Sequence, residues 1–219
     1  MHSAIRVGLL GESKQGQLAH LAIPRALDYA SDGQVECVWV PTDSVGKGES
    51  LAEFDGIWCV PGMPFRSAEG ALEGIRYARV TRTPFLGTSA GFQYTLIEFA
   101  RNVLGIPQAD HQKSNPKAAV PLISPLDAAL LGAKARVHFR DGTVLRKAYA
   151  SPISTEEYHC GFGLNPRYRR WLESSLIFSA VDDDDEVRAV ELDVHSPLVK
   201  AFAAAVVRRH NTLRAKVAS

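Results

Sequence analysis

The chain has 219 residues, 46% of them hydrophobic and 22% charged, and a formal net charge of +1, which is typical of an ordinary soluble globular protein. This charge balance gives no indication of a nucleic-acid or anionic-membrane partner. No apolar run reaches the length of a membrane span, and Met1-His2-Ser3 leads directly into an apolar segment. We therefore expect no leader peptide, no membrane association and a cytoplasmic protein.

The first half of the chain alternates short apolar strands with segments of helical periodicity. Strands are expected at residues 5–10, 35–40, 54–60 and 84–87, and helices at 18–29, 68–80 and 92–104. The first helix has Leu18, Leu21, Ala22, Ala26 and Tyr29 on or near one face. This βαββαβα order predicts a parallel sheet with helices on both faces.

The second half has a different character. Residues 106–132 look irregular and contain four prolines, and residues 135–149 alternate around Asp141-Gly142, which predicts a hairpin. Asn165-Pro166 opens a short helix to Glu173, strands are expected at 176–181 and 187–192, and a last helix at 198–209. The acidic run 182–186 is interpreted as a solvated turn, because no second carboxylate cluster completes a metal site.

Three cysteines, Cys37, Cys59 and Cys160, have no metal-type spacing. Cys37 and Cys59 fall inside apolar strands, which fits core packing in a thiol-reducing compartment. No G-x-x-x-x-G-K-[ST] phosphate loop occurs in the sequence. We expect neither a metal nor a cofactor.

The segment 84–93 joins a short strand to a helix through Gly87-x-Ser89-x-Gly91. This spacing has the form of a nucleophile elbow, in which small neighbours allow a strained residue at the tip of the turn. The turn would present Ser89 Oγ at the carboxyl edge of the sheet, where ligands of parallel sheets bind, together with the first amides of the helix. The alternative is a glycine-flanked turn with an incidental serine.

Most of the chain resembles the glutaminase domain of CTP synthase, a class I glutamine amidotransferase. The likeness lies in residues 54–57, 61–62, 69–70, 75–79, 84–87, 91–93 and 97–105, and again in 142–145, 156–159 and 165–168. It implies a flavodoxin-like sheet with an antiparallel addition. The resemblance does not extend to the synthetase domain of CTP synthase, for which 219 residues leave no room.

Several positions depart from the family pattern. The elbow carries Ser89 where the family has cysteine, and no His-Pro-Glu motif occurs, although His195 lies near its expected place. The family loop P-G-G-F-G is replaced by residues 61–65, in which Met63 keeps an amide for an oxyanion and Pro64 has none. The resemblance places Lys113 near the family's substrate-binding glutamate and His159 near its substrate-binding arginine.

The elbow also resembles, over five residues, that of the serine peptidases of the peptidase E and cyanophycinase group, which use serine, histidine and an acidic partner. Candidate bases are His111, His138, His159 and His195; His159, beside Glu156 and Glu157, is preferred. Its alternative is a pocket-lining or structural histidine. Cys160 is a second candidate nucleophile, with an ordinary strand cysteine as the alternative.

We therefore predict an α/β, flavodoxin-like (class I glutamine amidotransferase-like) three-layer sandwich, mainly parallel with an antiparallel C-terminal addition, as a single domain of residues 1–219. One hypothesis is an amide or ester hydrolase. Its catalytic candidates are Ser89, His159 and His195, and its oxyanion or substrate-binding candidates are Gly62, Met63, Ala90, Gln93 and Lys113.

The second hypothesis is a non-catalytic homologue that binds a small ligand or a partner subunit, and Gln93 would then be a structural hydrogen-bonding group. A third is that Ser89 stands in place of a native cysteine. The expected partners are a small amide or amino-acid-like molecule, a synthetase or other subunit, and a second copy of the chain in a homodimer.

Overall fold

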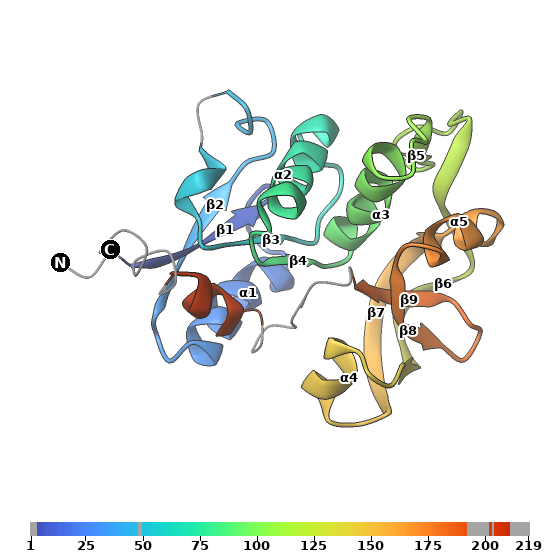
Figure 1. Ribbon diagram of the computed structural model, residues 1–219. Coiled ribbons are helices and arrows are strands. Elements are labelled where there is room, and N and C mark those ends of the chain that lie inside the picture. The colour runs from blue at the N-terminus through green and yellow to red at the C-terminus, as the bar shows by residue number, and fades with distance from the viewer. Residues whose placement is uncertain (1–3, 48–49, 192–201, 203, 211–219) are drawn as a thin grey trace. The chain divides into compact units, whose positions relative to one another are not determined.

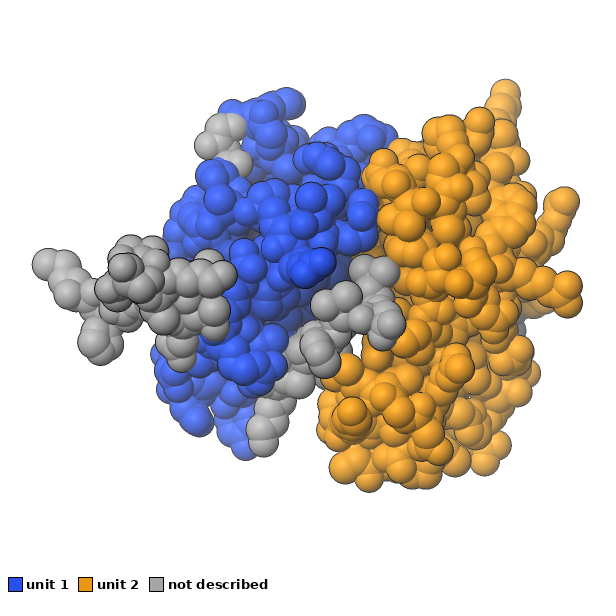
Figure 2. Space-filling model, in the orientation of Figure 1, with its two compact units in different colours: residues 1–92, 197–219 blue, residues 93–196 orange. Residues whose placement is uncertain are grey.

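The computed structural model describes residues 4–47, 50–191, 202 and 204–210. By internal contacts the chain forms two compact units, coloured separately in Figure 2. Unit 1 comprises residues 1–92 and 197–219, and unit 2 comprises residues 93–196. The single domain expected for residues 1–219 stays a prediction.

Unit 1 contains a four-stranded parallel sheet (Figure 1). Its strand order is β2 (Val35–Val40), β1 (Ile5–Leu10), β3 (Gly56–Cys59) and β4 (Phe85–Gly87). Leu10 pairs with Val40 on one side and with Cys59 on the other, and Cys59 pairs with Gly87. The four carboxyl ends are therefore level, and the loops that follow them leave from one edge of the sheet.

The two faces of this sheet are covered by different helices. On one face Val7, Leu9 and Trp58 pack with Ile23 and Leu27 of α1 (Leu18–Ala30), and with Phe202 and Val206 near the C-terminal end. On the opposite face Leu10 lies against Gly74 of α2 (Ala68–Thr81). Because side chains alternate along each strand, they pack into one core on each face of the sheet, as predicted from the short apolar strands.

The buried stripe of α1 differs from the apolar face identified in the sequence. His20, Ile23 and Leu27 are buried, whereas Leu18 and Tyr29 are 82% and 88% exposed. The buried residues also have helical spacing. Contact with the sheet buries this face of α1, and the more apolar face is left exposed.

Helix α3 (Ala90–Asn102) begins in unit 1 and continues into unit 2. The unit 2 sheet has the order β5, β6, β8, β9, with β7 paired to β6. The β5–β6 pair is parallel and the other pairs are antiparallel, which is the antiparallel addition that the sequence predicted. Its strands are β5 (Ala109–His111), β6 (Val120–Phe139), β7 (Ile153–Leu164), β8 (Ile177–Asp182) and β9 (Val187–Glu191).

Two expectations for this half were wrong. The segment predicted as irregular holds β5 and the first part of β6, whose Pro125 lies beside a register shift, where the ladder tolerates a missing amide. The predicted hairpin at Asp141-Gly142 does not form, because Thr143 caps α4 (Val144–Tyr149), with its side chain accepting from the Arg146 amide. The partner of β6 is β7.

The remaining elements within the described residues agree with the sequence. Of the last helix expected at 198–209, residues 202 and 204–209 are described and helical, and the others lie outside the described residues. Strands β8 and β9 lie where they were expected, and Asn165 caps a 3-10 turn (Pro166–Tyr168) that leads into α5 (Arg169–Glu173). A second 3-10 turn covers Leu51–Glu53. Within the described residues, every helix is too short or too polar to cross a membrane.

Candidate functional site

Ser89 occupies the turn between β4 and α3 with a φ of 52°, in the left-handed region that non-glycine residues rarely adopt. The turn is held by neighbours on both sides. The Thr88 amide donates to the Cys59 carbonyl at 3.1 Å, and the Gly91 amide donates to the Thr88 carbonyl at 3.0 Å. The indole of Trp58 also donates to Thr88 Oγ1 at 2.9 Å. The strained conformation is thus fixed by the adjacent strand β3.

Gly91 allows the helix to start close to the sheet. A Cβ atom at this position would lie 2.1 Å from the Cys59 carbonyl oxygen, far inside van der Waals contact. The second glycine of the Gly87-x-Ser89-x-Gly91 pattern is therefore required by the approach of backbone to backbone.

The loop after β3 leaves the sheet next to this turn. Gly62 has a φ of 125°, and the direction in which a side chain would point is filled by Gln17 and His20. The Lys14 ammonium donates to the Met63 carbonyl at 3.4 Å. Among the described residues no acceptor takes a hydrogen bond from the Met63 or the Ala90 amide. These are the two amides predicted for an oxyanion.

His20 is a residue of this edge that the sequence analysis missed. It is only 4% exposed, and Trp39 lies against its ring, with 5.0 Å between the ring centres. Its Nδ1 accepts from the Lys14 amide at 3.0 Å, and its Nε2 lies 2.7 Å from the Pro61 carbonyl oxygen. The available signal was its helical spacing with Ile23 and Leu27, which marks a histidine on a buried face.

A second missed group is the buried Glu12, which follows β1. Its Oε1 accepts from the amide and the hydroxyl of Thr42, at 3.0 and 2.5 Å. The Thr42 hydroxyl accepts in turn from the amide of Ser67, the N-cap of α2, at 2.9 Å. The loops after β1, β2 and β3 are thereby joined. Glu12 Oε2 is buried and has no hydrogen-bond partner in the described part of the chain.

Cys59 lies in the interior beneath these loops. Complete burial, together with the nearby carboxylate of Glu12, raises the pKa of its thiol far above the usual range. A thiol that stays protonated is a poor nucleophile, so Cys59 fits the core-packing role that the sequence predicted.

Unit 2 contains a buried polar cluster around Gln93, on α3. Gln93 Nε2 donates to Cys160 Sγ at 3.2 Å and to the Phe162 carbonyl at 2.9 Å, while Oε1 lies 3.1 Å from His111 Nε2. The Cys160 thiol donates to the same Phe162 carbonyl at 2.9 Å. Both amide hydrogens of Gln93 are used inside the protein, which agrees with the structural alternative for this residue.

His111 completes the cluster. Its Nδ1 accepts from the Lys113 amide at 3.1 Å, and the ring packs against Phe162 with 5.1 Å between the ring centres. Burial and, to a lesser extent, the nearby positive charge of Lys113 lower the pKa of His111 to about 4. With both nitrogens occupied, His111 has no free lone pair with which to act as a base.

The other predicted residues of unit 2 lie outside this cluster. The His159 side chain is 72% exposed, and its Nε2 lies 3.1 Å from Glu157 Oε1. It alternates with Cys160 along β7, so the two side chains point to opposite faces of the strand. His138 lies at the surface, 2.6 Å from Asp183. His195 falls outside the described residues.

The structure therefore groups the predicted residues in two sets. Gly62, Met63 and Ser89 lie in the loops that follow the neighbouring strands β3 and β4 of unit 1, and Ala90 is the first residue of α3. Gln93 and the Lys113 backbone both bind His111 in unit 2, where the Lys113 ammonium lies 5.9 Å from the centre of the Phe162 ring.

The acidic run beside β8 forms a turn organised by an aspartate. Asp182 Oδ1 accepts from the amides of Asp184 and Glu186 at 3.0 and 2.9 Å, while Oδ2 accepts from Arg188 Nε at 2.7 Å. The Asp182 side chain is buried, that of Arg188 is only 9% exposed, and their charges neutralise each other. In the described residues no group of three histidine, cysteine or acidic side chains is placed to hold a metal ion.

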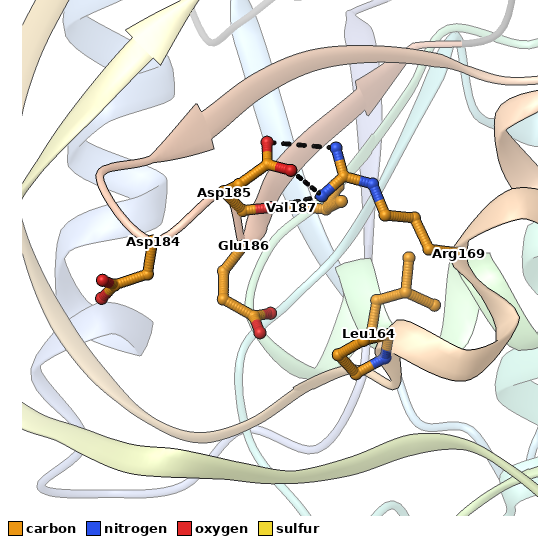
Figure 3. Close-up of a pocket in the computed structure, with 7 residues that line it drawn as sticks. Leu164, Arg169, Asp184, Asp185, Glu186 and Val187 are labelled. Atoms are coloured by element: carbon orange, nitrogen blue, oxygen red, sulfur yellow. Dashed lines mark hydrogen bonds and ion pairs between the residues drawn. The ribbon is translucent and has the colours of Figure 1, made fainter.

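A depression of about 270 Å³ borders this turn, lined by residues of β7, α5 and the acidic run. Figure 3 shows the guanidinium of Arg169 turned toward the carboxylate of Asp185. Their two hydrogen bonds measure 2.8 and 3.2 Å. The one basic group of this lining is thus already paired, and the depression contains none of the predicted site residues.

Comparison with known proteins agrees with this architecture. A family profile described as "Glutamine amidotransferase class-I" matches residues 23–202. CTP synthase of Thermococcus gammatolerans is 34% identical over 209 residues, which cover 88% of this chain and 39% of that protein. CTP synthase of Saccharolobus solfataricus is 30% identical over 207 residues, covering 86% of this chain and 38% of that protein. This chain thus spans about two-fifths of the length of these relatives.

Solved structures show the same fold. The glutaminase domain of Trypanosoma brucei CTPS, solved with bound acivicin, superposes with a TM-score of 0.80 at 20% identity, covering 94% of each chain. A glutamine amidotransferase from Thermotoga maritima superposes with a TM-score of 0.54 at 12% identity, covering 100% of this chain and 87% of that chain. The α/β, flavodoxin-like fold predicted from the sequence is confirmed.

Proposed function

Because this chain belongs to the class-I glutamine amidotransferase family, we propose that it is a CTP synthase glutaminase-like protein of altered chemistry, which cleaves an amide or ester with Ser89 as nucleophile. The observation that carries the proposal is the φ of 52° at Ser89, between a strand and a helix that Gly91 brings against Cys59. Strain of this kind persists where the surroundings enforce it, and it clusters at active sites.

The proposed reaction is acyl transfer. Ser89 Oγ bonds to the carbonyl carbon while its proton passes to a base, and the resulting oxyanion accepts from the amides of Met63 and Ala90. Collapse breaks the bond to the leaving amine or alcohol, which takes up that proton. Water then attacks the acyl-Ser89 ester, releases the acid and restores the serine hydroxyl.

A serine needs a well-placed base, because its hydroxyl is a weak nucleophile near neutral pH. We assign the base to His159 or His195. Glu157, 3.1 Å from His159, supplies an acidic partner that can orient its ring. Replacement of each histidine by glutamine distinguishes the two, since only loss of the true base lowers the rate by about two to four orders of magnitude.

We propose a small amide or amino-acid-like compound as the substrate, rather than glutamine itself. Gln93 has its amide hydrogens engaged with Cys160 and Phe162, and Lys113 places a positive charge where the family resemblance expects a glutamate. The substrate-contact roles of Gly62 and Lys113 belong to this proposal, whereas Gln93 takes the structural role.

The deciding experiment is intact-mass analysis after exposure to a fluorophosphonate, with peptide mapping of the adduct. Phosphorus bonds to Ser89 Oγ with loss of fluoride, so we expect one adduct that disappears in Ser89→Ala and persists in Ser175→Ala, a control at an exposed serine. A folded wild-type protein that forms no adduct overturns the hydrolase proposal. Ser89→Cys is expected to react faster with iodoacetamide than Cys37 or Cys160 does.

A non-catalytic homologue is the second candidate, favoured by the internal hydrogen bonds of Gln93 and by the absence of a His-Pro-Glu motif. This chain spans 39% of the Thermococcus gammatolerans CTP synthase, and for this candidate we propose a synthetase-type partner or a second copy of the chain. The absence of a Ser89 adduct in the folded wild-type protein supports this candidate. Light scattering against the chain mass of 23.9 kDa tests the homodimer.

A further inference from the structure

His20 joins two loops at the carboxyl edge of the unit 1 sheet. The Lys14 amide donates to Nδ1 at 3.0 Å, so Nδ1 carries a lone pair. The Pro61 carbonyl, 2.7 Å from Nε2, can only accept, so Nε2 carries the hydrogen. These two contacts define one neutral tautomer of a ring that is only 4% exposed.

The carbonyl that His20 holds belongs to the peptide just before Gly62. Glycine reaches positive and negative φ with similar ease, so the next peptide, which carries the Met63 amide, can turn over unless its surroundings hold it. Gly62 has a φ of 125°, and a Cβ there would lie 3.4 Å from His20 Nε2. The imidazole therefore holds the carbonyl on one side of Gly62 and fills the space beside its α-carbon.

The peptide that follows, between Met63 and Pro64, is held more weakly. Among the described residues, the Met63 carbonyl accepts only from the exposed ammonium of Lys14, at 3.4 Å. The amide and the ammonium of Lys14 thus act on the same loop, one through His20 and one directly. Of these contacts the one to Pro61, at 2.7 Å, is the shortest, and it comes from the buried ring of His20, so the orientation of the Met63 amide depends chiefly on His20.

We propose that His20 is a positioning residue that fixes the Met63 amide in the orientation needed to stabilise an oxyanion. This inference rests on the proposed role of Ser89 and extends it to a residue that itself touches neither the nucleophile nor the reacting atoms. Loss of a preorganised oxyanion donor lowers acyl-transfer rates by about two to three orders of magnitude, and a loosened donor by part of that.

Two conservative variants separate the two hydrogen bonds of the ring. In His20→Gln the side-chain amide reaches the place of Nε2 and keeps a donor for Pro61. In His20→Asn the side-chain oxygen lies at the place of Nδ1 and keeps an acceptor for Lys14. Each variant loses one hydrogen bond, so a purely structural role predicts equal losses of stability and of reactivity.

The measured quantity is the second-order rate of fluorophosphonate labelling of Ser89. We expect the labelling rate to fall by about tenfold to a hundredfold in His20→Asn and to stay within about threefold of the wild-type rate in His20→Gln. The two variants should have similar melting temperatures. Equal rates in the two variants, or the reverse order, overturn the proposal.

Backbone ¹⁵N order parameters at Gly62 and Met63 separate this inference from the proposed function. We expect lower order parameters in His20→Asn than in His20→Gln, whether or not Ser89 reacts. If the wild type forms no adduct, the hydrolase proposal fails and with it the oxyanion role of His20, while the order parameters still decide whether His20 orders the loop. Equal order parameters in both variants overturn the positioning role even where Ser89 does react.

Discussion

His20 in unit 1 and His111 in unit 2 have the same hydrogen-bonding pattern but hold different kinds of structure. Each accepts at Nδ1 from the backbone amide of a lysine, at 3.0 and 3.1 Å respectively. At Nε2, His20 holds the Pro61 carbonyl at 2.7 Å, whereas His111 holds the Gln93 side chain at 3.1 Å. One histidine therefore orders backbone, and the other orders a side chain.

The difference follows from the neighbours of each ring. At the edge of the unit 1 sheet the loops approach so closely that glycine is required at Gly70, where a Cβ would lie 1.8 Å from the Thr42 carbonyl, and at Gly91. In unit 2 a strand, a helix and a turn meet through the polar atoms of Gln93 and Cys160. Steric limits on the backbone thus shape the first region, and side-chain hydrogen bonds shape the second.

The largest expected effect is steric, at Gly91. In Gly91→Ala the added Cβ meets the Cys59 carbonyl at 2.1 Å, and strand and helix must separate. We expect a loss of about 3 kcal/mol or more in the free energy of unfolding, at the upper end for an overpacked site. Gly142→Ala, at a φ of 82° with open space around it, is the control and should lose about 1 kcal/mol. Urea denaturation measures both, and equal losses would contradict the steric account.

The second effect is a pH dependence that arises in the unit 2 cluster. The pKa of His111 is lowered to about 4 when folded, against about 6.5 when unfolded. The unfolded chain binds more protons between these values, so stability rises with pH from about 4 to 6.5 and is lost as the pH falls through that range. The contribution is up to about 3 kcal/mol. His111→Gln should flatten the profile, whereas an unchanged slope, or a similar flattening in the surface control His138→Gln, would contradict the assignment.

The third effect is the loss of a hydrogen-bonding hub. Gln93→Leu leaves the buried Nε2–H of His111 and the Phe162 carbonyl without this partner. We expect a loss of about 2 kcal/mol in the free energy of unfolding, because unsatisfied buried groups keep their desolvation cost. Gln108→Leu, at an exposed position, serves as the control. If Gln93→Leu is as stable as that control, the cluster does not hold unit 2 together.

The smallest effect is expected at Thr42, where a side-chain hydroxyl joins two loops of unit 1. Thr42→Val removes the hydroxyl between Glu12 and the Ser67 amide while keeping the shape of the residue. The Thr42 amide still donates to Glu12 at 3.0 Å, so we expect a loss of only about 1 kcal/mol in thermal or urea unfolding. Thr155→Val, in β7 with an exposed side chain, is the control. A loss larger than that of Gln93→Leu would reverse the contrast between the two regions.

Much of the parallel sheet could be predicted because its signals are local. Residues 5–10 and 35–40 are strands within the bounds expected from their apolar runs, and the strand–turn–helix around Ser89 follows from glycine spacing. The errors lie where partners are distant in sequence. Residues 120–132 read as irregular because of their prolines, yet residues 123–125, 130 and 131 pair with residues 159–164 of β7 across the unit 2 sheet. Strand pairing over that separation outweighs local preference.

The sequence by itself determined the family, the α/β class, the order of the first seven elements and Ser89 as the residue at the tip of the turn, since each depends on short-range spacing or on a recognisable pattern. Only the tertiary structure decided which face of α1 is buried, and hence that His20 reaches Pro61 while Leu18 is exposed. It also decided that Gln93, His111 and Cys160 form one cluster. Such contacts join residues that are 18 to 67 positions apart, and their geometry depends on how helices and strands pack rather than on any local pattern.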